Sequence, residues 1–128
     1  MDKYNNIKSA EDVRILEEAS NGMHDGIIVS IEFKNDGIIR TGDYSMRFDY
    51  QKVELKLRIR VTSDFDKLIE LYFKEVYDYN LHNCPFEEMF TFSIAFDGLG
   101  IIWRDDVPNS TSSNYIHAKE LSWRIVSD

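Results

Sequence analysis

The sequence contains a single cysteine, Cys84, and its apolar runs are only a few residues long. One cysteine cannot form an internal disulfide, which suits a reducing compartment. No segment approaches the roughly 20 apolar residues that a membrane helix needs. The polar N-terminal stretch also lacks the apolar core of a signal peptide. These absences predict a cytoplasmic protein that has no membrane partner.

Basic residues are few relative to acidic ones. Lys and Arg total 15 against 23 Asp and Glu, which gives a formal net charge of -8. Such a surface repels phosphate backbones, so we expect no direct binding to nucleic acid. It would attract a basic protein, and acidity also aids solubility in general.

Linkers and internal repeats are missing as well. No segment rich in Pro, Gly and Ser divides the 128 residues, and hydrophobic residues make up 43% of them, which is enough for a core. We therefore predict a single domain over residues 1–128, with residues 1–8 as a loose lead-in.

One short stretch, residues 10–20, has the periodicity of a helix. Ser9 can cap it, and Asp12 stands three residues later, in the position of a capping box. Asn21 and Gly22 are suited to end it. The face predicted to meet the core carries Val13, Leu16 and Ala19.

After this helix the period changes to two, which is the period of strands. Residues 27–34 are predicted to form a half-buried strand, and Asn35-Asp36-Gly37 is typical of a hairpin turn. The apolar side of that strand would carry Ile27, Val29, Ile31 and Phe33. Residues 52–61 alternate most regularly of all. Their polar side is a basic stripe, either a solvated sheet face or a binding face, made of Lys52, Glu54, Lys56, Arg58 and Arg60.

The later segments are also mostly strand-like. Residues 64–80 fit an aromatic helix stripe or an alternating strand that is broken at Glu75 by a bulge. Residues 90–96 and 115–126 alternate, the latter with a change of side near Lys119-Glu120, and 105–114 is the clearest loop. The predicted fold is α+β and mostly β. It has one N-terminal helix and about six largely antiparallel strands in a curled sheet or a small sandwich.

The pair His24-Asp25 resembles a metal-binding dyad of one hydrolase family, but it leads straight into a strand. The other histidines, His82 and His117, show no ligand spacing, so we expect neither a metal nor another cofactor. Turn chemistry at Asp25-Gly26 explains the pair more simply. A rival hypothesis is an enzyme or ligand-binding cleft near His24, Asp25, His82 and Cys84.

Tyrosines and acidic pairs are the other candidates for contact with a partner. Four tyrosines either form an interface or pack across strands, namely Tyr72, Tyr77, Tyr79 and Tyr115. The protein-binding surface that we predict combines acidic residues with one of these tyrosines. It consists of Glu87, Glu88, Asp105, Asp106 and Tyr115.

Three segments give the chain a resemblance to small bacterial immunity proteins of polymorphic toxin systems. "MHDGIIVSIEF" resembles the strand with which several of those families open, "LYFKEVYDYNL" resembles a Phe-x-x-Val strand, and "ELSWRI" resembles a terminal Trp-x-Ile strand. Glu75 stands where such a strand more often has a small residue. The likeness covers roughly residues 22–126.

This resemblance implies a β-rich α+β domain, with residues 68–80 in a strand. It also implies a non-catalytic protein that binds and blocks a cognate toxin, with His24-Asp25 as a structural signature. The alternatives that remain are the small-ligand binder or enzyme described above and a subunit that self-associates through an aromatic strand face.

Overall fold

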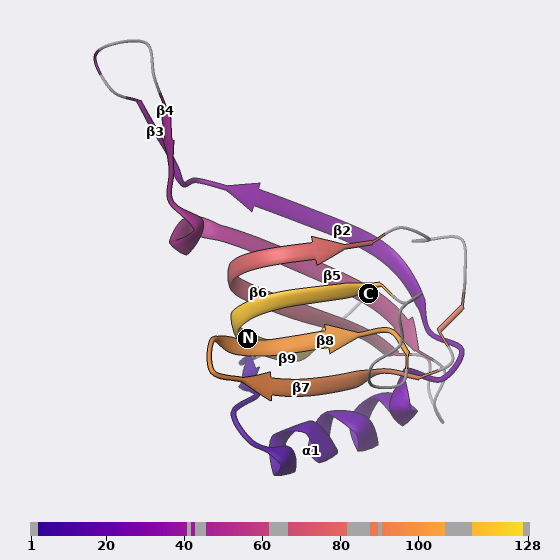
Figure 1. Cartoon of the computed structure of the whole chain (residues 1–128). Helices are drawn as coiled ribbons and strands as arrows, with labels where there is room; N and C mark the ends of the chain where they lie inside the picture. Colours follow the sequence, from indigo (N-terminus) through magenta and orange to yellow (C-terminus); the bar gives the residue numbers. More distant parts are fainter. Residues whose placement is uncertain are drawn as a thin grey trace.

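The computed structural model describes residues 3–40, 42, 46–61, 67–81, 88–89, 91–106 and 114–126 (Figure 1). Its main body is a seven-stranded antiparallel sheet in the order β2-β5-β6-β9-β8-β7, with β1 paired to β9. The elements are β1 (Asn5–Asn6), α1 (Ala10–Ser20), a 3-10 turn (Asn21–Met23), β2 (Ile27–Asn35), β3 (Ile38–Arg40), β4 (Met46–Phe48), a second 3-10 turn (Tyr50–Lys52), β5 (Val53–Val61), β6 (Lys67–Asn80), β7 (Ser93–Asp97), β8 (Gly100–Arg104) and β9 (Tyr115–Val126). The predicted fold class, one N-terminal helix and a mostly antiparallel curled sheet, is confirmed.

The helix has the ends that its sequence predicts. The Ser9 hydroxyl accepts a hydrogen bond from the Asp12 N–H at 3.3 Å, and the Asp12 carboxylate accepts one from the Lys8 N–H at 2.9 Å. Asn21 ends the helix in the left-handed conformation, with φ 53°. Leu16 on the predicted face is completely buried. Among the described residues, no helix is long and apolar enough to cross a membrane.

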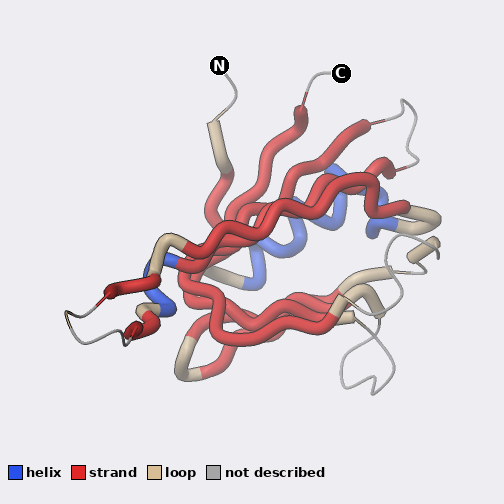
Figure 2. Tube along the Cα trace, turned by 90° about the horizontal axis from the view of Figure 1, so that it is seen from above, coloured by secondary structure: helices blue, strands red, loops and turns tan. Residues whose placement is uncertain are grey.

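The sheet folds over on itself because β6 and β9 are shared between two half-sheets (Figure 2). In the first half-sheet, residues 67–74 of β6 and 120–126 of β9 lie among β2, β5 and β1. In the second half-sheet, residues 76–80 of β6 and 115–118 of β9 lie beside β8 and β7. The ambiguous segment is therefore a strand over the part that is described, 67–80, while 62–66 lie outside the described residues.

The sheet bends where β6 and β9 pass from one half-sheet to the other, and at this bend the buried side chains of each strand switch from one face of the strand to the other. Glu75 has φ 53° and faces Lys119, to which it forms an ion pair of 3.4 Å. Phe73 and Val76 on either side of Glu75 are both buried, and so are Ala118 and Leu121 on β9. This confirms the predicted change of side near Lys119-Glu120 and a break in the alternation at Glu75, but the irregularity of the ladder itself lies between Val76 and Asp78. The core fills the space between the half-sheets, with α1 along the side opposite β2 (Figure 1).

The prediction for the apolar side of β2 is wrong. Its predicted members are all exposed, at 38, 53, 44 and 47% for Ile27, Val29, Ile31 and Phe33. For Ile27 and Val29 the cause is a register shift at Val29, which turns Ile28 instead toward the core, opposite Ile59. Ile31 and Phe33 do lie on the core side, opposite Leu57 and Leu55, and are exposed because β2 is the end strand of the sheet, where the core gives less cover.

The turn at Asn35-Asp36-Gly37 does not join neighbouring strands of the sheet. The Asn35 side chain accepts a hydrogen bond from the Gly37 N–H at 2.9 Å, as an Asx turn requires. The chain then enters the hairpin of β3 and β4, which extends beyond the sheet (Figure 1), and β2 pairs instead with β5.

We predict that Gly100→Ala lowers the free energy of unfolding by about 2 kcal/mol or more, because Gly100 has φ 154° and a Cβ would lie 2.2 Å from the Ala118 carbonyl oxygen. Gly98→Ala is the control, since no atom lies within 4 Å of its Cβ position, and we expect a change within about 0.5 kcal/mol. Urea unfolding of both variants checks this. Equal losses would contradict the close packing of β8 on the bend.

Candidate functional site

Acidic groups and a tyrosine meet where β8 ends and β9 begins. Tyr115 is the cross-strand partner of Arg104. Its hydroxyl donates a hydrogen bond of 2.5 Å to the Asp78 carboxylate on β6, and the Arg104 guanidinium lies 5.5 Å from its ring centre. Asp105 and Asp106 follow directly on β8. We call the set Asp78, Arg104, Asp105, Asp106 and Tyr115 the acidic–tyrosine surface.

Asp105 holds the two strand ends of this surface together. Its carboxylate accepts hydrogen bonds from the backbone N–H of Asn114 at 2.9 Å and from the Asn114 side-chain amide at 2.7 Å. The Asp105 N–H donates in return to the Asn114 carbonyl at 3.2 Å. Burial raises the pKa of Asp105, and the hydrogen bonds from Asn114 offset part of that rise. This carboxylate therefore positions the surface, and Asp78 is its exposed acid.

The predicted protein-binding set is only partly brought together. Asp105, Asp106 and Tyr115 are neighbours, whereas Glu88 is exposed next to Met89, whose backbone forms an isolated bridge to Gly26. Glu87 lies outside the described residues. Asp78 joins the set only in the structure, because β6 and β9 bring residues 37 positions apart into contact.

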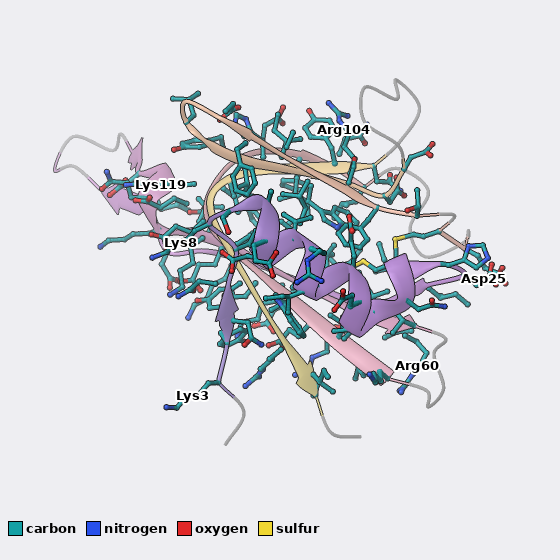
Figure 3. The ribbon with its side chains drawn as sticks, turned by 90° about the horizontal axis from the view of Figure 1, so that it is seen from below. Lys3, Lys8, Asp25, Arg60, Arg104 and Lys119 are labelled. Carbon is teal, nitrogen blue, oxygen red and sulfur yellow. The ribbon has the colours of Figure 1, made fainter. Side chains whose placement is uncertain are left out.

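His24 and Asp25 form the turn that leads into β2. Both side chains are about half exposed, and the imidazole Nε2 lies 3.6 Å from the Asp25 carboxylate. Asp25 has φ 59°, and its N–H donates to the Met89 carbonyl at 2.8 Å. Figure 3 places Asp25 at the C-terminal end of the helix, exposed at the rim of the molecule. This geometry fits the turn chemistry predicted from the sequence.

The rival cleft cannot be assembled from the described residues, since His82 and Cys84 lie outside them. The third histidine, His117, lies on β9, and its Nε2 atom is 3.0 Å from the Asp97 carboxylate on β7. Within the described ranges, no group of three or more His, Cys, Asp or Glu side chains is arranged to hold a metal ion.

Two grooves are lined by other residues. The larger, about 290 Å³, lies between the segment before α1, the β7–β8 hairpin and the bend, and its walls include Ile7, Phe96, Ile101 and Leu121. The smaller, about 200 Å³, lies beside Asn5 and Trp123. Lys8 and Lys119 at the larger groove lie at the opposite end of the helix from Asp25 (Figure 3). Neither groove contains a residue of the predicted sites.

The basic stripe of β5 belongs to an outer face with its own internal partners. Arg58 and Arg124 lie opposite Glu70 on the two neighbouring strands. Their Nε atoms donate to its two carboxylate oxygens at 3.0 and 2.8 Å, and the Tyr4 hydroxyl donates to it as well. Glu70 is only 1% exposed. Sequence reasoning missed this network, because it depends on the alignment of β1, β5, β6 and β9.

Burial alone would raise the pKa of Glu70, but the hydrogen bonds from Tyr4, Arg58 and Arg124 outweigh it and lower the pKa. Burial and the bond to Glu70 raise the pKa of Tyr4 to about 12. Lys56 contributes through its ammonium, 4.9 Å from the centre of the Tyr72 ring. The stripe is thus engaged within the sheet, which favours the sheet-face interpretation over a binding face.

Each of the four tyrosines contacts another ring or a charged group, which agrees with the packing interpretation. Ring centres are 5.3 Å apart for Tyr72 and Tyr4, and 5.6 Å apart for Tyr79 and Phe33. Tyr77 packs at 5.1 Å on the ring of His117 and donates a hydrogen bond to the Leu99 carbonyl. Tyr79 nevertheless remains 43% exposed.

We predict that Glu70→Gln lowers the free energy of unfolding at pH 7 by about 1–3 kcal/mol, because two guanidinium groups lose their carboxylate partner. The pKa of Glu70 is lowered in the folded state, so this stabilisation is present above the unfolded pKa and is lost as pH falls through the folded pKa. The gap between parent and variant should therefore shrink below about pH 4. Urea unfolding across pH measures it. Glu120→Gln, exposed on the same face, is the control, and an equal loss there or a gap independent of pH would contradict the network.

For the turn, we predict that Asp25→Asn changes the free energy of unfolding by no more than about 0.5 kcal/mol, since Asn tolerates a positive φ. Asp25→Val should lower it by about 1–2 kcal/mol, because a β-branched residue is strained there. Thermal unfolding compares the two. A loss with Asn as large as with Val would show that the carboxylate itself carries the turn.

Comparison with known proteins adds no assignment to this geometry. No family model matches the chain, and neither a curated protein nor a solved structure matches it. No residue role therefore comes to this chain from a relative, and a functional proposal has to start from the contacts, charges and exposure of its own side chains.

Proposed function

We propose that the protein is a non-catalytic protein-binding module that contacts a basic region of its partner through the acidic–tyrosine surface. The observation that carries the proposal is the fixed position of Tyr115, held by the Asp78 carboxylate and the Arg104 guanidinium. Tyrosine is enriched at protein interfaces because its ring is large and rigid and its hydroxyl tolerates water.

Pre-organisation supports this proposal. A side chain that is already ordered loses little entropy when a partner binds, so more of the contact energy appears as affinity. Tyr115 is ordered by two neighbours, and the strand ends beside it are tied by Asp105 and Asn114. The surface therefore offers an aromatic contact at low entropic cost.

Charge supports the same proposal. The surface has acidic groups at Asp78, Asp105 and Asp106 against the single cation of Arg104, and the whole chain has a net charge of -8. Such a field accelerates encounter with a basic partner and disfavours acidic ones.

Within this class, we infer an immunity-type role, in which the partner is a cognate toxin. The support is the resemblance of the three strand segments to immunity proteins, together with the acidic surface. If the toxin is a basic nuclease, acidic groups such as Asp106 can occupy its phosphate sites and block access of nucleic acid.

The experiment measures binding of the full-length protein to the purified toxin domain encoded beside its gene. We expect Tyr115→Ala to weaken the affinity by about thirtyfold, as for a central aromatic contact. Asp78→Asn combined with Asp106→Asn should slow association, and the slowing should fade at high salt. Stopped-flow or surface-based kinetics at two salt concentrations gives both quantities.

Glu17→Gln combined with Glu18→Gln is the matched control, since it removes the same charge from exposed positions of α1. It should leave the affinity within about twofold of the parent. Absence of binding to the toxin domain would overturn the immunity role. Binding that is equally insensitive to both double variants and to Tyr115→Ala would place the interface elsewhere.

A further inference from the structure

Strand β2 is an unusually open end of the sheet. Among the described residues, β5 pairs along one edge of it, and no strand pairs along the other. It is 9 residues long and contains no proline. An edge of this kind is a template for another strand, and proteins normally shorten, charge or cover it.

The inner side of β2 is also apolar and accessible. Ile31 and Phe33 lie opposite the buried Leu57 and Leu55, yet they are 44 and 47% exposed. The Phe33 ring packs on Tyr79, which is itself 43% exposed. The half-sheets diverge from the bend (Figure 2), so the end strand receives less cover than β5. An occupant of this edge would bury both an apolar side and a row of backbone groups.

We propose that the occupant is β2 of a second copy of this chain, paired antiparallel about a two-fold axis to form one continuous sheet. With a two-fold axis perpendicular to the sheet, the inner sides of the two copies lie on the same face of the continuous sheet. Residues can then pair only with residues that point the same way, so the possible registers are few.

Charge selects among these registers. Centring the axis on Glu32 places two glutamates opposite each other, and centring it on Lys34 does the same with two lysines. Centring it on Ile31 draws the register shift at Val29 into the ladder. Centring it on Phe33 places Glu32 of each copy opposite Lys34 of the other, so the strand is complementary to itself in this register.

Packing in that register agrees with the charges. The two Phe33 side chains lie opposite each other on the inner side, and Ile31 of each copy lies diagonal to Phe33 of the other. The ladder covers residues 31–35 of β2, so it stays clear of the register shift at Val29. A single register thus buries the accessible apolar residues of the inner side and pairs the opposite charges of the outer side.

This inference is independent of the proposed function, because no residue of the proposed β2 ladder belongs to the acidic–tyrosine surface. The test is sedimentation equilibrium of the full chain over a range of concentrations. We expect a dimer that dissociates on dilution. Glu32→Lys and Lys34→Glu should each raise the dissociation constant about tenfold, because the dimer contains the pair twice and each pair becomes repulsive. The double variant with both changes restores opposite charges and should recover the dimer.

Each change also alters a pair within the monomer, since Glu32 lies opposite Lys56 and Lys34 opposite Glu54. Thermal unfolding at low concentration measures that effect separately, and Glu17→Lys on α1 is the charge-matched control. Amide exchange of residues 30–35 should slow as concentration rises. A monomer at every concentration, or a dimer whose stability ignores these charges, would overturn the proposal.

Discussion

The bend at Glu75 and Lys119 is the constraint on which the rest of the molecule depends. Two long neighbouring strands change side at the same level there, and Glu75 takes a positive φ to allow it. One sheet thereby supplies both layers around a core, so a single short helix suffices to close one side. Without this bend, the apolar sides of β5 and β6 would have no layer to face.

The bend also separates the charges of the outer surface. Arg58 and Arg124 lie on the first half-sheet, where the buried Glu70 neutralises part of their charge. Asp78 and Asp105 lie on the second half-sheet. Because charges of opposite sign sit on differently oriented faces, the cations of one face are paired with a buried carboxylate, while the acids of the other are bonded to uncharged groups and keep their negative charge. The distribution of charge, more than the net charge, decides which part of the surface the proposed basic partner would meet.

The helix and most strands are predictable because capping and alternation depend on residues close together in the sequence. The strand order and the contacts between distant strands are not predictable in this way. Ser9, Asp12 and Asn21 act within one turn of the helix, so their roles can be read from neighbouring letters. Alternation also revealed β5 and the change of side near Lys119. The partner of β2, the Glu70 network and the contact of Tyr115 with Asp78 depend on which strands lie side by side, and alternation alone carries no information on strand order. The same gap explains why alternation predicts neither the register shift at Val29 nor the exposure of Ile31 and Phe33 on an end strand.

The order of elements along the chain explains why β2 stays uncovered. The helix contains 11 residues and is therefore about 16 Å long, and it joins β2 through the tight turn around Asp25. It is also tied at its start to β1, which pairs with β9. Held at both ends, it lies along the side of the sheet opposite β2 (Figure 1) and cannot also shield that strand. In the proposed dimer no additional element is needed, because β2 of each copy covers the open edge of β2 of the other.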